Sequence, residues 1–255
     1  MLTQDADENL TIIRKAFRTV LMQMDPRNDL QELQVALLQW SCCADYVLDL
    51  HCDHFAVMHL YAASQRPQDT LTLCRAVGAR LALIADESGG SAFDEAHAVP
   101  WAQLQRRYGD RFPIPAGSFS STVEYRGQFD VSDELAAADA AGLMVFLAAV
   151  GAVRTAASLP QRQLDAVRRP LAGAAEVYAR QGGVVTLAQA VGAEVAAGDV
   201  LGHVTDPVSR RRMPILVPVS GMLFRCELWR SCLRGQGHAH VAGETIVRSG
   251  NLLSE

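Results

Sequence analysis

The sequence predicts an α/β layer followed by a small all-β unit, and three observations carry this prediction. In the first half, apolar runs short enough for strands alternate with segments whose apolar residues recur at helical spacing. From residue 175 onward, short apolar runs are punctuated by glycine, as in strands joined by tight turns. Between the halves, Pro160 and Pro170 lie among polar residues and predict a connector at 154–174. We therefore expect domains at 1–153 and 175–255.

Each element of the first half is predicted from its local pattern. Helices are expected at 10–24, 30–43, 70–77 and 133–150, and Ser132 is expected to cap the last of them. Strands are expected at 46–51, 56–61 and 80–85, which are short and apolar, and a further strand is expected to carry Glu124. Residues 87–91 and 113–117 are loops by composition. Asp94, Glu95 and His97 are expected in a solvated polar loop.

Composition narrows the class of protein. With 255 residues, 49% of them hydrophobic, the chain can bury a substantial core. A net charge of −5 argues against nucleic acid as the main partner, and the short basic run Arg210–Arg212 is interpreted as a solvated loop. The amino terminus is acidic, and no apolar run reaches about eighteen residues. These features predict a cytoplasmic protein with no membrane span.

Six cysteines are spread along the chain without any Cys-x-x-Cys spacing, so reduced thiols are the expectation. Cys52 lies next to a histidine, so a nucleophilic role is one alternative for its thiol. Because buried cysteines are common in ordinary cores, and no neighbour in the sequence marks this thiol as reactive, a structural role is preferred for Cys52.

The segment Ala44–Asp53 predicts a buried strand that delivers a histidine and carboxylates to its end, with Asp49-Leu50-His51 as its key residues. About seventy residues later, Thr122-Val123-Glu124 belongs to a second strand. A metal ligand and a general base that converge from two strands are typical of a zinc hydrolase. The alternatives are a His51 satisfied by local hydrogen bonds and a Glu124 that lies on the surface or caps an element.

Three neighbours of these residues have predicted roles. Alternation along the strand would place Asp53 on the face of His51, so Asp53 is predicted to be the partner of the imidazole. The planar fork of Arg126 could bind a substrate carboxylate, and a salt bridge to Asp130 or Asp133 is an equal alternative. His54 and His59 are interpreted as structural.

Asp49-Leu50-His51, Thr122-Val123-Glu124 and the glycine-rich carboxyl half, in this order, resemble the succinylglutamate desuccinylase/aspartoacylase family. The resemblance implies a zinc-carboxypeptidase-like α/β layer, here partial, followed by a small all-β barrel-sandwich domain. By this likeness His51 matches the last zinc ligand, and Glu124 matches the carboxylate that activates the zinc-bound water. The implied activity is that of a zinc-dependent deacylase, which removes an N-acyl group from an amino acid or a related small amine.

Two motifs of that family are absent from this sequence. No glutamate follows any of the seven histidines at the third position, so the His-x-x-Glu zinc pair is missing, and Asn9 is followed by Leu10 in place of the Asn-Arg motif. We expect the chain to begin just downstream of these motifs, with one of the three protein ligands that catalytic zinc normally has. The alternative is a non-catalytic relic that acts as an interaction or assembly module. Its uncovered sheet edge would favour a homo-oligomer.

The carboxyl half also resembles biotinyl/lipoyl-type barrels, in Val195–Gly202 and Pro218–Gly221. A swinging-arm carrier needs a lysine to modify, and the only lysine of the chain is Lys15. Because Lys15 lies outside this half, attachment of such a cofactor there is excluded.

Overall fold

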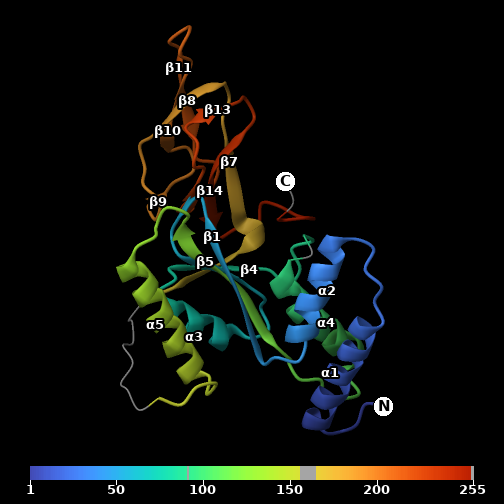
Figure 1. Cartoon of the computed structure of the whole chain (residues 1–255). Helices are drawn as coiled ribbons and strands as arrows, with labels where there is room; N and C mark the ends of the chain where they lie inside the picture. Colours follow the sequence, from blue (N-terminus) through green and yellow to red (C-terminus); the bar gives the residue numbers. More distant parts are fainter. Residues whose placement is uncertain (91, 156–164, 254–255) are drawn as a thin grey trace.

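In a computed structural model, a five-stranded sheet forms the centre of the first half of the chain (Figure 1). The structure describes residues 1–90, 92–155 and 165–253. The strands follow the order β1-β5-β3-β4-β6, and they are β1 (Tyr46–Asp53), β3 (His59–Ala62), β4 (Leu81–Ile84), β5 (Phe119–Gly127) and β6 (Val167–Pro170). Strand β1 runs parallel to β5, whereas β3 runs antiparallel to β5 and parallel to β4.

Helices cover both faces of this sheet (Figure 1). They are α1 (Ala6–Met22), α2 (Asp29–Ser41), α3 (Pro67–Val77), α4 (Phe93–Tyr108) and α5 (Asp133–Ala149). Because side chains alternate along a strand, Ala82 and Val123 join the apolar core under α3 and α5, whereas Leu81 and Leu83 pack on the other face. That other face meets Phe224 of the carboxyl half. None of the described helices is long and apolar enough to cross a membrane.

Side-chain caps set where three of the helices begin. Helix α1 starts earlier than expected, because the carboxylate of Asp5 accepts hydrogen bonds from the backbone N–H groups of Asp7 and Glu8. Ser132 caps α5 as predicted, accepting from the N–H of Leu135 at 3.2 Å. Asn28 does the same for α2.

Two expectations were wrong. Helix α4 was not predicted, and Asp94 and His97 are buried within it rather than solvated in a loop. The sequence pattern did not predict α4 because Pro100 lies inside it, and proline normally breaks a helix. Residues 167–170 fall in the expected connector, yet they form β6, which pairs with β4 over only four residues. Pro160 lies outside the described residues.

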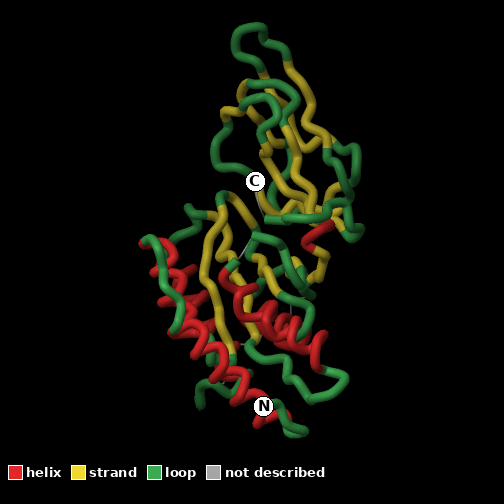
Figure 2. The backbone as a smooth tube through the Cα atoms, turned by 90° about the vertical axis from the view of Figure 1, so that its right-hand side faces the viewer, coloured by secondary structure: helices red, strands yellow, loops and turns green. Residues whose placement is uncertain are grey.

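The carboxyl half is built from two antiparallel sheets around one core (Figure 2). One sheet has the order β11-β10-β8-β13 and the other β2-β12-β14-β7, with β9 paired to β12. Their bounds are β2 (Phe55–Ala56), β7 (Ala174–Tyr178), β8 (Gly183–Leu187), β9 (Glu194–Val195), β10 (Val200–Thr205), β11 (Arg212–Leu216), β12 (Gly221–Cys226), β13 (Ser231–Cys232) and β14 (Gly237–Gly243); a single 3₁₀ turn, Leu171–Gly173, precedes β7. Because β2 comes from the first half and pairs with β12, it joins the two halves through backbone hydrogen bonds.

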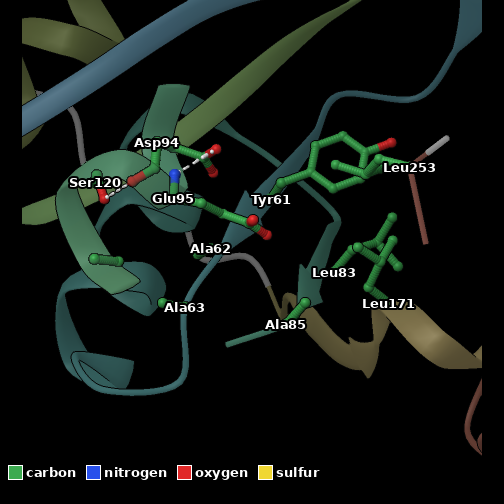
Figure 3. A pocket seen from close by; sticks show the side chains of 11 residues that line it. Tyr61, Ala62, Ala63, Leu83, Ala85, Asp94, Glu95, Ser120, Leu171 and Leu253 are labelled. Carbon is green, nitrogen blue, oxygen red and sulfur yellow. Dashed lines mark hydrogen bonds between the residues drawn. The ribbon is translucent and has the colours of Figure 1, made fainter. Parts of the chain in front are cut away.

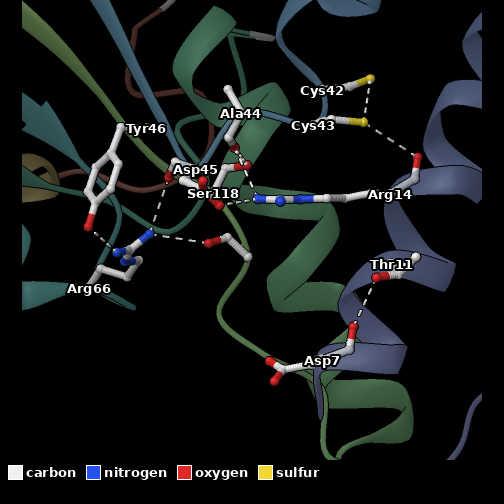
Figure 4. Close-up of polar contacts among 11 residues, drawn as sticks. Asp7, Thr11, Arg14, Cys42, Cys43, Ala44, Asp45, Tyr46, Arg66 and Ser118 are labelled. Carbon is white, nitrogen blue, oxygen red and sulfur yellow. Dashed lines mark hydrogen bonds and ion pairs between the residues drawn. The ribbon is translucent and has the colours of Figure 1, made fainter. Parts of the chain in front are cut away.

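The start of β1 is held by side chains from three other segments (Figure 4). Arg14 of α1 forms an ion pair with Asp45 at 2.7 Å, and the Ser118 hydroxyl donates to the carbonyl oxygen of Ala44 at 2.5 Å. Arg66 donates to the carbonyl oxygen of Asp45 and to the hydroxyl of Tyr46. These contacts fix the strand that carries His51 at its other end.

Replacing Gly142 with alanine is expected to destabilise the protein, although alanine is the better helix former. A Cβ at position 142 of α5 would lie 2.8 Å from the carbonyl oxygen of Ala76 and 3.0 Å from the Cα of Val77, both backbone atoms of α3. We expect the overpacking to outweigh the helix-propensity gain and to lower the free energy of unfolding by about 1–2 kcal/mol. Urea unfolding measures this.

The control is Ala140→Gly, at an exposed position of the same helix. Its free energy of unfolding should fall by about 1 kcal/mol, because glycine has a lower helix propensity than alanine. A stabilised Gly142→Ala variant would contradict the close approach of α3 and α5.

Candidate functional site

His51 and Glu124 lie side by side at the carboxyl ends of two neighbouring parallel strands. They are direct register partners in the ladder between β1 and β5, so their side chains leave the same face of the sheet. This is the face opposite Val123, which points into the core under α3 and α5. The structure therefore brings together the two residues on which the predicted hydrolase site depends.

The carboxylate next to His51 is Asp49, not Asp53. Nε2 of His51 lies 3.1 Å from Oδ2 of Asp49, two residues back on the same strand face. When Nε2 carries the hydrogen toward Asp49, Nδ1 keeps its lone pair, and a carboxylate commonly orients a ligating imidazole in this way. Asp49 thus makes the contact that was predicted for Asp53.

The ladder between β1 and β5 changes register just after His51. His51 pairs with Glu124 and Asp53 pairs with Gly127, so β5 uses one residue more than β1 between the two pairs. The extra length is taken up beside Arg126, whose backbone has φ +63°, a conformation that residues other than glycine rarely adopt.

Arg126 is engaged by a partner that the sequence did not suggest. Its two terminal nitrogens donate to the two carboxylate oxygens of Asp139 on α5, at 3.1 and 2.6 Å. This pairing raises the pKa of the guanidinium further, and its partner is neither Asp130 nor Asp133, the two carboxylates named as alternatives to a substrate. Asp130 instead accepts from the N–H of Gly127. The planar fork of Arg126 is therefore already occupied by a carboxylate of the chain itself.

Glu124 has the electrostatic character of a general base. Burial raises its pKa to about 7, the negative charges of Asp53 and Asp49 raise it as well, and His51 and Arg225 lower it. Its Oε2 is buried with no hydrogen-bond partner among the described residues. A carboxylate that titrates near neutral pH and has a free oxygen can take a proton from a water molecule and return it.

An ion-pair chain joins the end of β1 to the carboxyl half. Oδ2 of Asp53 lies 3.2 Å from Nε of Arg225 on β12, and Arg225 also approaches Glu227 at 3.4 Å. Glu227 in turn lies 2.8 Å from Nδ1 of His54. The Asp53 side chain is only 8% exposed, so its charge depends on this partner. No signal in the sequence pointed to Arg225.

Two groups close to Glu124, His59 and Tyr61, stay neutral. His59 is the register partner of Glu124 on β3 and is fully buried; burial lowers its pKa to about 4, as it lowers that of His240 to about 3. Nδ1 of His59 lies 2.9 Å from the carbonyl oxygen of Val57, and the ring packs edge-on against Phe224. Burial, with the nearby charge of Glu124, raises the pKa of Tyr61. The structural interpretation of His59 fits this environment.

A small cavity lies on the same sheet face near α4 (Figure 3). Tyr61, Asp94, Glu95 and Leu253 contribute to its lining, and its volume is about 20 Å³. Burial raises the pKa of Asp94 to about 6. The cavity has room for about one water molecule and none for an amino-acid substrate. This cavity is therefore too small to be the substrate site.

The described residues do not by themselves make up a catalytic zinc centre. Such a centre normally has three protein ligands and an open position for water. Within the part of the chain that the structure describes, no group of three or more His, Cys, Asp and Glu side chains is placed to hold a metal ion. His51 and Asp49 fit one ligand and its supporting carboxylate, which is one part of the expected donor set.

The raised pKa of Glu124 predicts how protein stability depends on pH. A carboxyl whose pKa rises from an ordinary 4.5 to about 7 on folding contributes stability below pH 4.5 that is lost as the pH rises through 7. Glu124→Gln removes this loss. We expect the variant to exceed the wild type by about 2–3 kcal/mol in free energy of unfolding at pH 8, and to match it near pH 4.

Urea unfolding at the two pH values tests this expectation, with Glu194→Gln at an exposed position as the control. An equal offset at both pH values would show that Glu124 is not held in a desolvated environment.

Comparisons with known proteins agree with this geometry at the level of the fold. No family model matches the sequence, and no curated protein sequence matches it significantly. A succinylglutamate desuccinylase/aspartoacylase family protein from Shewanella amazonensis superposes with a TM-score of 0.82 at 21% identity, over 93% of this chain and 66% of its own. A succinylglutamate desuccinylase/aspartoacylase from Shewanella frigidimarina gives 0.82 at 21% identity, over 94% and 65%.

The ectoine utilization protein EutE (DoeB) from Ruegeria pomeroyi gives a TM-score of 0.63 at 17% identity, over 88% of this chain and 68% of its own. The chain thus spans about two thirds of the length of the solved structures that it matches. It has the fold of the succinylglutamate desuccinylase/aspartoacylase family proteins over nearly all of its described residues.

Proposed function

We propose that this chain supplies the general base of an amide hydrolase. The enzyme would remove an N-acyl group from an amino acid or a related small amine. The observation that carries the proposal is the pairing of His51 with Glu124 on one sheet face, with the pKa of Glu124 raised to about 7. Support for the substrate class comes from the structural neighbours, whose names refer to desuccinylase and aspartoacylase activities.

In this proposal Glu124 acts twice. Its carboxylate takes a proton from a water molecule while the water oxygen attacks the acyl carbonyl carbon. The same proton then passes to the amine nitrogen as the C–N bond breaks, which yields a carboxylic acid and a free amine. His51, which Asp49 contacts, faces the same surface from the neighbouring strand.

By its resemblance to the family, the chain would bind zinc through His51. Zinc binding is a separate proposal from the role of Glu124. When bound, zinc would supply Lewis-acid activation of the water and of the carbonyl. Metal analysis of the purified protein tests it, with His51→Ala beside His54→Ala as the matched pair. Stoichiometric zinc that is lost only in His51→Ala would support the assignment, whereas zinc retained in His51→Ala would contradict it.

The test of the activity is release of free amine from a panel of N-acetyl and N-succinyl amino acids, with and without added zinc. We expect turnover of at least one of these classes. A folded, cooperatively unfolding protein that releases no amine under either condition would refute the proposed activity for this chain.

One observation favours a second function, that of an interaction or assembly module. Helix α2 exposes four large apolar side chains to solvent. Because this surface lies apart from the His51 and Glu124 pair in sequence and on another element, it can accompany a catalytic role or stand alone.

A further inference from the structure

Helix α2 carries apolar side chains on two opposite faces. One face packs on the rest of the chain through Val35 and through Cys42 at the helix end, both buried. The opposite face holds Leu30, Leu33, Leu37 and Trp40, whose exposed fractions are 65%, 56%, 36% and 82%. A surface helix normally has one apolar face, packed on the core, and a polar face toward solvent. We call these four exposed residues the α2 stripe.

The α2 stripe has the spacing of a coiled-coil seam. Its members are separated by three, four and three residues, which is the a and d pattern of a heptad repeat. The stripe is also symmetric about Val35 in sequence. In an antiparallel pair of α2 helices, Leu30 therefore meets Trp40 of the partner subunit, and Leu33 meets Leu37 of the partner subunit.

We propose that α2 pairs with α2 of a second copy of this chain, antiparallel and about a two-fold axis. The area fits this occupant, since the stripe exposes roughly 500 Å² when a large side chain is taken as about 150–250 Å². A symmetric pair that covers the stripe completely buries about 1,000 Å² from these side chains alone, which reaches the lower limit for a specific interface. A two-fold pairing uses the same patch on both copies and closes on itself.

The charges of α2 argue against a membrane as the occupant. Asp29 and Glu32 are its only charged residues, and both are acidic. Helices that lie on membranes are rich in Lys and Arg beside their apolar face. A second protein copy needs no such charges.

The first test measures the mass of the whole chain by sedimentation equilibrium over a dilution series. We expect a dimer, and we expect Leu33→Glu to raise the dissociation constant at least about a hundredfold by placing charge in the seam. Val208→Glu is the matched control, at a 91% exposed position between β10 and β11, and it should leave the dimer intact. Circular dichroism should show the same fold and cooperative melting for both variants, since both positions are exposed.

The second test checks the register. Leu33→Glu and Leu37→Lys should each be monomeric, and mixing them should restore a one-to-one dimer, because the two new side chains then face each other across the axis. A monomeric wild type, a dimer that persists in Leu33→Glu, or a mixture that stays monomeric would each overturn the proposal. So would a monomer that cosediments with anionic phospholipid vesicles, which would assign the stripe to a membrane.

Discussion

Replacing Glu124 with glutamine is expected to lower kcat for amide hydrolysis by about a thousandfold, within the range that positioned general bases contribute. Glutamine keeps the shape of the side chain but cannot take a proton from water. Since the substrate does not have to contact the proton acceptor to bind, KM should change little. The measurement is steady-state amine release by the wild type and the variant, with Glu194→Gln as the control.

The pH dependence of kcat/KM distinguishes a catalytic role of Glu124 from a structural one. Because the base must be ionised and burial raises its pKa to about 7, kcat/KM of the wild type should rise with pH and level off above 7. Glu124→Asp should keep a rising limb at a shifted pH, with a lower plateau. A Glu124→Gln variant that retains the wild-type rate would remove Glu124 from the reaction. Loss of the fold cannot explain its inactivity, because the same variant is expected to be more stable than the wild type above neutral pH.

The central pair of the site could be predicted because its determinants are local. Each motif lies within a single strand, and the order of the two motifs along the chain matched that of a known family. The sequence predicted that the two residues converge from different strands, and in the structure they are register partners on one face of the sheet.

What the sequence missed depends on contacts between distant segments. Alternation along β1 places both Asp49 and Asp53 on the face of His51, but Asp49 makes the contact and Asp53 pairs with Arg225. Arg225 reaches Asp53 only because β2 pairs with β12, and no periodicity links positions so far apart in the chain. Strand β6 has four residues and Pro170 at its end, so it is stabilised by its neighbour β4 rather than by its own propensity.

Arg225→Met is expected to lower the free energy of unfolding by about 3–5 kcal/mol, the cost of leaving a buried charge without its partner. The carboxylate of Asp53 is 8% exposed, and the guanidinium of Arg225 lies 3.2 Å from it. Methionine covers the apolar part of the arginine stem, so lost packing contributes little. Denaturant unfolding at pH 7 measures the effect.

Two further variants separate charge from shape. Arg14→Met breaks an ion pair whose Asp45 side chain is 73% exposed, and it should cost no more than about 1 kcal/mol. Adding Asp53→Asn to Arg225→Met should restore much of the lost free energy of unfolding, because no buried charge is then left without a partner. Glu227, the other partner of Arg225, still has His54 at 2.8 Å. If Arg225→Met costs no more than Arg14→Met, the ion pair does not hold the two halves together. The negative charge that helps raise the pKa of Glu124 would then have to be stabilised by solvent instead of by the carboxyl half.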